Sequence, residues 1–259
     1  MYGISLDIRP TGGLTFRRMP SAILHISTYP FLPPTTMSGW LRRLLMLSAG
    51  HYPDTNVKKP DYFALPPEYC VLGAYPFPDP QRDYQVHTTH RQGIRAFNHN
   101  AFSRVVRYAD SKEVYQLHTW EYLMVEHLRG YILHQNARAL EFLRQVVNYG
   151  CKLGKEGYAY LESMSEVKPL EQVRANARPA TLVPAMDLVS HPSTLYTLYR
   201  YQFKPEKRFE ADLRHPTPSA IEGFVPVRAG WPAEDTIELD YWTDGDVHLP
   251  VSLVEMFYG

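Results

Sequence analysis

The sequence predicts an α+β protein with a ferredoxin-like fold, in which two strand–helix–strand units share one antiparallel sheet. A strand-like segment opens the chain, helix-like segments lie near residues 36–48 and 136–150, and strand-like segments follow both helices. This order is the split βαβ pattern. We therefore expect one such domain over residues 1–170, interrupted by an insertion at about 80–113. Residues 171–259 are expected to add β structure packed against it, because no flexible linker separates the two parts.

The first strand and the first helix have the clearest patterns. Apolar and polar residues alternate over 2–9, which is the period of a half-buried strand. Three prolines, the last of them Pro34, keep the approach to the helix extended. We expect the helix to begin after Pro34 with Thr35 or Thr36 as its cap, because residues 37–45 then place their apolar side chains on one face.

The remaining elements follow from similar patterns. Asn136 is expected to cap a second helix that Gly150 ends. The segment 22–27 fits a short strand or irregular structure, and 51–59 fits a loop. Segments rich in β-branched and aromatic residues predict further strands, namely 68–75, 115–125, 130–133, 158–164, 194–203, 220–227 and 237–242.

The composition gives a neutral chain whose charge is unevenly distributed. The 27 basic residues balance the 27 acidic ones. However, the first 60 residues hold seven Lys or Arg against two acids, whereas 231–259 holds seven acids and no Lys or Arg. This distribution suits an anion at one end and a basic partner at the other, or it is ordinary scattered surface charge.

Composition also indicates a compartment. The start of the chain lacks a signal-peptide pattern and no apolar run approaches the length of a membrane span, so we expect a cytoplasmic protein without membrane contact. Cys70 and Cys151 form neither a disulfide framework nor a zinc knuckle and are expected to be buried thiols.

The start of the first helix is a candidate phosphate site. Thr35, Thr36, Ser38 and a small glycine there offer free backbone N–H groups and the positive end of the helix dipole. An extended segment ending in Arg17 and Arg18 can bring two guanidinium groups near it. The simpler alternative is an ordinary capped helix.

The segment 82–107 is basic and aromatic. It contains five arginines, three histidines and one acid, mixed with Tyr84, Phe97 and Phe102, and shows no helical stripe. Arginines that bind phosphates, interleaved with aromatic rings that stack on bases, are typical of a contact with single-stranded nucleic acid. A solvated basic loop or hairpin is the alternative.

Three features together resemble the CRISPR-associated Cas-five family of RAMP proteins, whose domain is RRM-like. They are the opening strand followed by Tyr-Pro-Phe-Leu-Pro-Pro-Thr-Thr-Met-Ser-Gly-Trp-Leu at 29–41, the basic insertion at the place of the family's thumb, and Asn-Tyr-Gly-Cys-Lys-Leu-Gly-Lys-Glu-Gly-Tyr-Ala-Tyr-Leu at 148–161. The resemblance covers residues 1–170. The family's later glycine-rich loop is not evident here.

The resemblance implies a non-catalytic subunit of a type I Cascade surveillance complex. Such a subunit caps the 5′ handle of the crRNA and nucleates the backbone for antiviral DNA targeting. Its implied partners are crRNA, the repeated backbone subunit, the large subunit and nearby target DNA. The helix start and the glycine turn would contact the handle, and the thumb would contact spacer nucleotides and the neighbouring subunit. The expected RNA-binding residues are Arg17, Arg18, Thr35, Thr36, Ser38, Arg42, Arg43, His87, His90, Arg91, Arg95, Arg104, Arg107 and Lys155.

The sequence supports three other functions less well. One branch of the family cuts precursor crRNA without metal, and Tyr29 lies roughly where that branch has a tyrosine, with His87 or His90 as possible bases. The branch's adjacent Lys and His are missing here. A zinc site at His87, His90 and His99 lacks cysteines or an acid at suitable spacing. A purely structural subunit would leave the arginine cluster unused. We therefore expect no catalytic residue, cofactor or metal.

Overall fold

The computed structural model describes residues 1–19, 25–52, 63–94, 115–204, 212–216 and 220–259. Its helices and strands, in chain order, are β1 (Tyr2–Pro10), β2 (His25–Ile26), α1 (Pro34–Ser48), β3 (Cys70–Pro76), β4 (Gln85–Ile94), β5 (Tyr115–Met124), β6 (Leu128–His134), α3 (Ala137–Phe142), η1 (Leu143–Val146), β7 (Gly150–Lys152), β8 (Tyr158–Met164), β9 (Lys168–Pro169), β10 (Glu171–Ala177), β11 (Val183–Pro184), η2 (Ala185–Leu188), β12 (Ser193–Phe203), β13 (Ile221–Pro232), β14 (Ile237–Thr243), β15 (His248–Pro250) and α4 (Val251–Tyr258).

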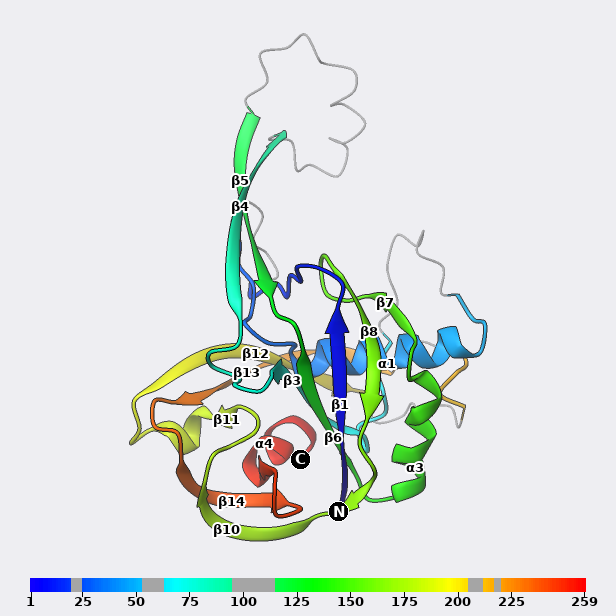
Figure 1. Ribbon diagram of the computed structural model, residues 1–259, viewed down its shortest axis with the longest axis vertical. Helices are drawn as coiled ribbons and strands as arrows, with labels where there is room; N and C mark the ends of the chain where they lie inside the picture. Colours follow the sequence, from blue (N-terminus) through cyan, green and yellow to red (C-terminus); the bar gives the residue numbers. More distant parts are fainter. Residues whose placement is uncertain (20–24, 53–62, 95–114, 205–211, 217–219) are drawn as a thin grey trace.

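The central sheet has the ferredoxin-like strand order. Its strands run β3-β6-β1-β8-β7, with β9 also paired to β1, and every pair is antiparallel. The first strand–helix–strand unit is β1-α1-β3, and the second is β6-α3-β8 (Figure 1). The second and third strands of the motif, β3 and β6, pair antiparallel although the insertion with β4 and β5 separates them in the sequence, and β1 lies between β6 and β8. The predicted fold class is confirmed.

The core lies between this sheet and its helices. Leu6 and Ile8 of β1 are fully buried, as are Met37, Leu41 and Leu44 of α1. The apolar stripe predicted for 37–45 therefore does face the sheet. A glycine in β6 permits the contact, because a Cβ at Gly130 would lie 2.5 Å from the terminal methyl of Met37.

Both helix boundaries differ from the sequence prediction. α1 begins at Pro34, and its N-cap is Pro33, with no side-chain hydrogen bond at the cap. The prediction that Thr35 or Thr36 caps it is wrong, because proline already supplies the φ of the first helical position. Asn136 does cap the second helix, and its side chain accepts a hydrogen bond from the backbone N–H of Arg138. That helix ends at Phe142 and not at Gly150, since a 3₁₀ turn follows it.

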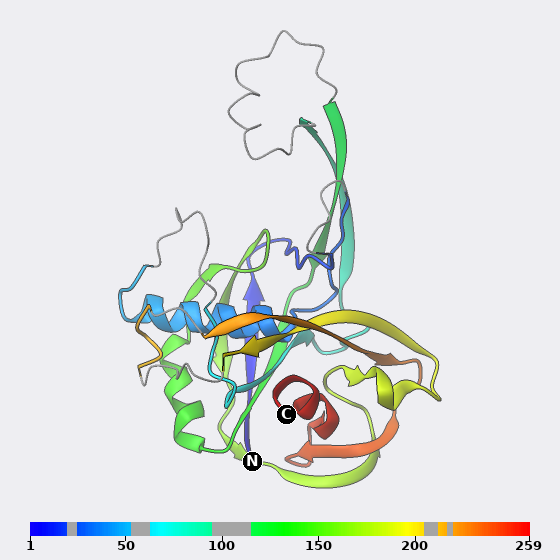
Figure 2. The same ribbon diagram turned by 180° about the vertical axis from the view of Figure 1, so that it is seen from behind.

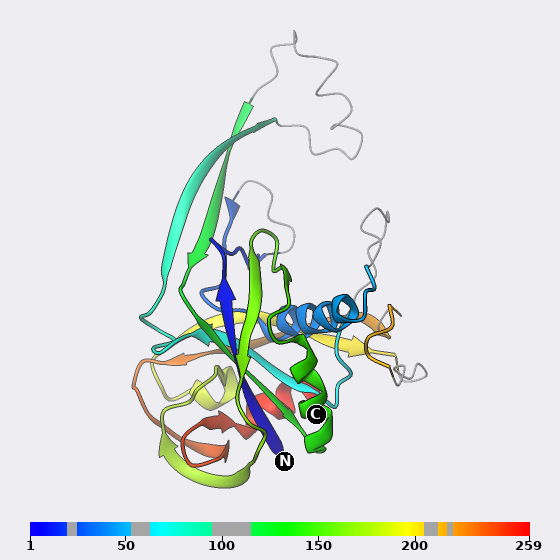
Figure 3. The ribbon, with the colours of Figure 1, turned by 45° about the vertical axis from the view of Figure 1, so that its right-hand side comes forward.

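The basic insertion contains a strand that the sequence pattern did not show. β4 pairs with β5 along its whole length, and this hairpin projects from the body of the molecule (Figures 1 and 3). Strand Gln85–Ile94 lacks the alternation of a half-buried strand because its residues from 85 to 90 are mostly exposed on both faces.

The C-terminal segment shares the core of the central sheet. It forms two three-stranded sheets, β10-β14-β15 and β11-β13-β12, with α4 lying between them (Figure 2). Leu198, Trp231 and Phe257 belong to the same buried cluster as residues of β1 and α1. Strand β10 and helix α4 were not predicted. No helix in the described ranges is long and apolar enough to span a membrane.

Candidate nucleic-acid interface

A cleft of about 600 Å³ lies at the N-terminal end of α1. Its walls come from the segment before β2, α1 as far as Arg43, the segment before β3, the end of β7 with the turn that follows it, and strand β12. The residues that line it are Phe16, Arg17, Thr35, Thr36, Gly39, Trp40, Arg43, Phe63, Lys152, Leu153, Gly154, Lys155 and Tyr201.

The helix start supplies hydrogen-bond donors to this cleft. The first N–H within α1 that finds a helical acceptor is that of Met37, which donates to the Pro33 carbonyl at 2.9 Å. The N–H groups of Thr35 and Thr36 precede it and have no acceptor within the helix. Both residues line the cleft and are partly exposed. The arrangement offers donors at the positive end of the helix dipole.

The glycine turn between β7 and β8 forms another wall of the cleft. The Lys155 N–H donates to the Thr15 carbonyl at 2.8 Å, and the Thr15 N–H donates to the Glu156 carbonyl at 2.9 Å. Gly154 has φ +76°, and a Cβ there would lie 2.6 Å from the Thr15 carbonyl oxygen. Only glycine therefore fits this approach of the turn to the segment that carries Arg17.

The lining of the cleft is cationic. Arg17, Arg43, Lys152 and Lys155 contribute positive charge, and none of its described lining residues is acidic. In a chain with 27 basic and 27 acidic residues, this is a local concentration of charge. Aromatic rings lie beside the cations. Such a surface suits the phosphates and bases of a single strand.

Five of the predicted RNA-binding residues converge here, although they come from distant parts of the sequence. They are Arg17, Thr35, Thr36, Arg43 and Lys155. Lys152 and Tyr201 also line the cleft and were missed by sequence reasoning. The signal for Lys152 was present in the same glycine-rich stretch as Lys155, but nothing in the sequence placed Tyr201 near α1.

Ser38 and Arg42 do not reach the cleft surface. The Ser38 side chain is buried, and its hydroxyl oxygen accepts a hydrogen bond from the Leu65 N–H at 3.0 Å. Arg42 is only 2% exposed, and its Nη2 donates to the His215 carbonyl at 3.0 Å. The prediction that these two side chains contact phosphates is wrong, because both are buried and hydrogen-bonded to the backbone.

The other predicted residues lie away from the cleft or outside the described residues. Arg18 is exposed, and its guanidinium lies 5.3 Å from the centre of the Tyr196 ring. His87 and His90 are exposed on β4, where the His90 Nδ1 lies 3.4 Å from the Thr119 hydroxyl. Arg91 belongs to the same strand, opposite His118. Arg95, His99, Arg104 and Arg107 lie outside the described residues.

The tyrosine considered for catalysis lies in the interior. Tyr29 is 4% exposed and its hydroxyl donates to the Thr197 carbonyl. Burial raises the pKa of Tyr29 to about 12, so this hydroxyl stays protonated at neutral pH. The described lining of the cleft contains no histidine. No group of three potential metal ligands occurs among the residues that the structure describes.

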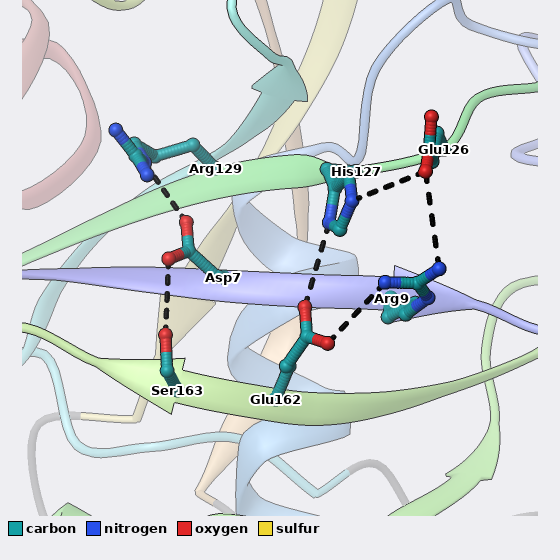
Figure 4. Close-up of polar contacts among 7 residues, drawn as sticks. All are labelled: Asp7, Arg9, Glu126, His127, Arg129, Glu162 and Ser163. Atoms are coloured by element: carbon teal, nitrogen blue, oxygen red, sulfur yellow. Dashed lines mark hydrogen bonds and ion pairs between the residues drawn. The ribbon is translucent and has the colours of Figure 1, made fainter.

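Charged groups on the β1–β6–β8 sheet pair with one another (Figure 4). The Arg129 Nε lies 2.9 Å from Oδ1 of Asp7, and the Ser163 hydroxyl donates to Oδ2 of the same carboxylate at 3.0 Å. Arg9 and His127 both contact Glu162, at 3.4 and 3.5 Å. RRM domains bind RNA through aromatic residues on a sheet. This part of the sheet carries ion pairs instead, which favours the cleft at α1 as the interface.

Comparisons with known proteins find several similar solved structures. No family model matches the chain, and no curated protein matches it. Two cryo-EM structures of the type III-B Cmr-beta complex, one bound to cognate target RNA and AMPPnP and one to cognate target RNA, contain a similar chain. The first is 12% identical with TM-score 0.44, over 90% of this chain and 85% of that one. The second is 13% identical with TM-score 0.42, over 90% and 86%. A CRISPR protein from Archaeoglobus fulgidus is 11% identical with TM-score 0.38, over 95% and 97%.

Proposed function

We propose that this protein is a non-catalytic RNA-binding subunit of a CRISPR ribonucleoprotein, and that its α1 cleft holds the 5′ handle of the crRNA. The observation that carries the proposal is the convergence of Arg17, Arg43, Lys152 and Lys155 on one cleft whose described lining contains no acidic residue. The assignment to a type I Cascade complex is supported by the sequence resemblance at 29–41 and 148–161.

The cleft would bind RNA mainly through its phosphates. The four cations neutralise backbone charge, and the N–H groups of Thr35 and Thr36 donate to one phosphate at the helix start. Arginine binds phosphate with two donors, whereas lysine acts as a point charge. Contacts of this kind fix the position of the strand and carry little sequence information.

The projecting hairpin is proposed to reach the partners. Strands β4 and β5 extend from the body that contains the cleft (Figure 1). His87, His90 and Arg91 lie along β4, where they would contact spacer nucleotides or the repeated backbone subunit. By the same resemblance, the large subunit and the target DNA would lie nearby.

Salt-dependent binding of labelled single-stranded RNA tests this function. Fluorescence anisotropy would give the affinity of the full chain over a range of salt concentrations. We expect Arg43→Ala and Lys155→Ala each to weaken binding and to reduce the slope of log K against log salt by about 0.7, the value for one lost contact with a single strand.

The control for this experiment is an arginine outside the cleft. Arg174 on β10 is exposed and its Nε lies 3.0 Å from Glu238. Arg174→Ala should leave both affinity and slope unchanged. If all three variants weakened RNA binding equally, or if none of them weakened it, the cleft would be excluded as the binding site. A discrete product from precursor crRNA incubated without metal would instead assign the protein to the nuclease branch.

A further inference from the structure

Three aromatic side chains form a contiguous surface on the β12–β13 hairpin, which we call the aromatic face. Tyr201 and Phe224 are partners across the two strands, and their ring centres lie 5.6 Å apart. Phe203, two residues further along β12, lies 5.7 Å from Tyr201. These separations are typical of rings in direct contact.

The aromatic face points away from the hydrophobic core. Side chains alternate between the two faces of a strand, and Tyr196 and Leu198 of β12 are buried in the core. Tyr201 and Phe203 are therefore on the other face and remain partly exposed. Phe224 is 42% exposed. Isolated exposed apolar residues are common, but three adjoining rings form a patch that requires an explanation.

Tyr201 connects this surface to the cationic cleft. Its ring lines the cleft, and its hydroxyl donates to the Thr35 carbonyl at 2.7 Å. This hydrogen bond fixes the ring beside the first turn of α1. The aromatic face therefore adjoins the cationic cleft at Tyr201.

We propose that the aromatic face is a stacking platform for the bases of a single-stranded RNA whose phosphates occupy the cleft. The proposal rests on the proposed function and adds a second set of contacts to the same site. Unpaired bases expose flat apolar surfaces, and an aromatic side chain beside a phosphate-binding groove is the usual way to hold them. The absence of acidic side chains from the described cleft lining favours a polyanion that continues onto these rings.

The ring geometry indicates which side chain matters most. The Tyr201 ring is inclined by 48° to Phe224 and by 59° to Phe203. The three rings therefore do not form one plane, and a base can stack flat on only one of them. Phe224 is more exposed than the other two. Phe224 is thus the principal stacking residue.

Anisotropy titrations with single-stranded RNA test the platform. Phe224→Ala should weaken binding by about 5- to 150-fold, the range for loss of one stacked base, and should leave the salt slope unchanged because no phosphate contact is lost. Phe224→Trp should restore the affinity. Phe142→Ala, which removes a similarly exposed ring on α3, should have no effect.

RNA that carries abasic sites provides the second measurement. If Phe224 stacks on a base, the difference between wild type and Phe224→Ala should disappear when the nucleotides next to the cleft lack bases. Failure of the wild-type protein to bind any RNA would overturn the proposed function together with the platform. Wild-type binding that depends on Arg43 and Lys155 but is unchanged by Phe224→Ala would overturn the platform alone. A reduced salt slope in Phe224→Ala would also overturn it, because the change would then act through the cleft.

Discussion

Arg42 and Arg43 are neighbours in the sequence but occupy different environments. Arg42 is 2% exposed and donates to the carbonyl of His215. Arg43 is partly exposed and lines the cationic cleft. One residue along a helix rotates the side chain by about 100°, which is enough to exchange the interior for the surface. The two arginines therefore have separable roles.

We expect Arg42→Ala to lower stability and not to act on RNA directly. The loss of a buried charged hydrogen bond should cost about 2–3 kcal/mol of the free energy of unfolding, measured by urea denaturation. The salt slope of RNA binding should stay at the wild-type value while the variant is folded. Arg43→Ala is the matched comparison: it should reduce the salt slope of RNA binding and leave the free energy of unfolding near the wild-type value. A reduced salt slope in Arg42→Ala without a loss of stability would instead show that Arg42 contacts the RNA.

The glycine turn at 153–157 is the element that positions Lys155. Gly154 has φ +76°, and an added Cβ would lie 2.6 Å from the Thr15 carbonyl oxygen, the same oxygen that accepts the Lys155 N–H. We expect Gly154→Ala to destabilise the fold by about 1–3 kcal/mol through backbone strain, as measured by urea denaturation. It should also weaken RNA binding because the turn moves Lys155. Gly12→Ala, which has open space around it, should do neither. Identical behaviour of the two variants would contradict this account.

The same turn shows what the sequence can and cannot predict. Glycine and lysine spacing identified it, and strand β8 after it was predicted over its correct range, Tyr158–Met164. Local pattern also identified the buried face of α1. It could not show that Arg42 turns inward, since this depends on the carbonyl of His215, which lies 173 residues away. It could not show β4 either, because a strand in a projecting hairpin buries little of either face.

At the scale of the whole molecule, residues before and after position 170 belong to one core. The Trp231 ring centre lies 5.3 Å from that of Tyr75 in β3. The Tyr258 hydroxyl of α4 accepts from the Val71 N–H at 3.0 Å and donates to the Val71 carbonyl at 2.8 Å. Helix α4 escaped prediction because its eight residues carry mostly apolar side chains without polar alternation. Its place depends on β3, far away in the sequence.

This shared core predicts that the two parts unfold together. Leu253 of α4 is fully buried, and Leu253→Ala should cost about 2–5 kcal/mol by leaving a cavity. Far-UV circular dichroism reports all the helices and strands, whereas tryptophan fluorescence includes Trp40 in α1 and Trp231 in β13. If the core is one unit, both signals should follow a single transition in urea, and the variant should shift both to the same lower midpoint. Two separate transitions, of which only one responds to Leu253→Ala, would show that the C-terminal segment folds independently. The α1 cleft would then lose part of its rigid support, because the Tyr201 hydroxyl of the C-terminal segment donates to the carbonyl of Thr35.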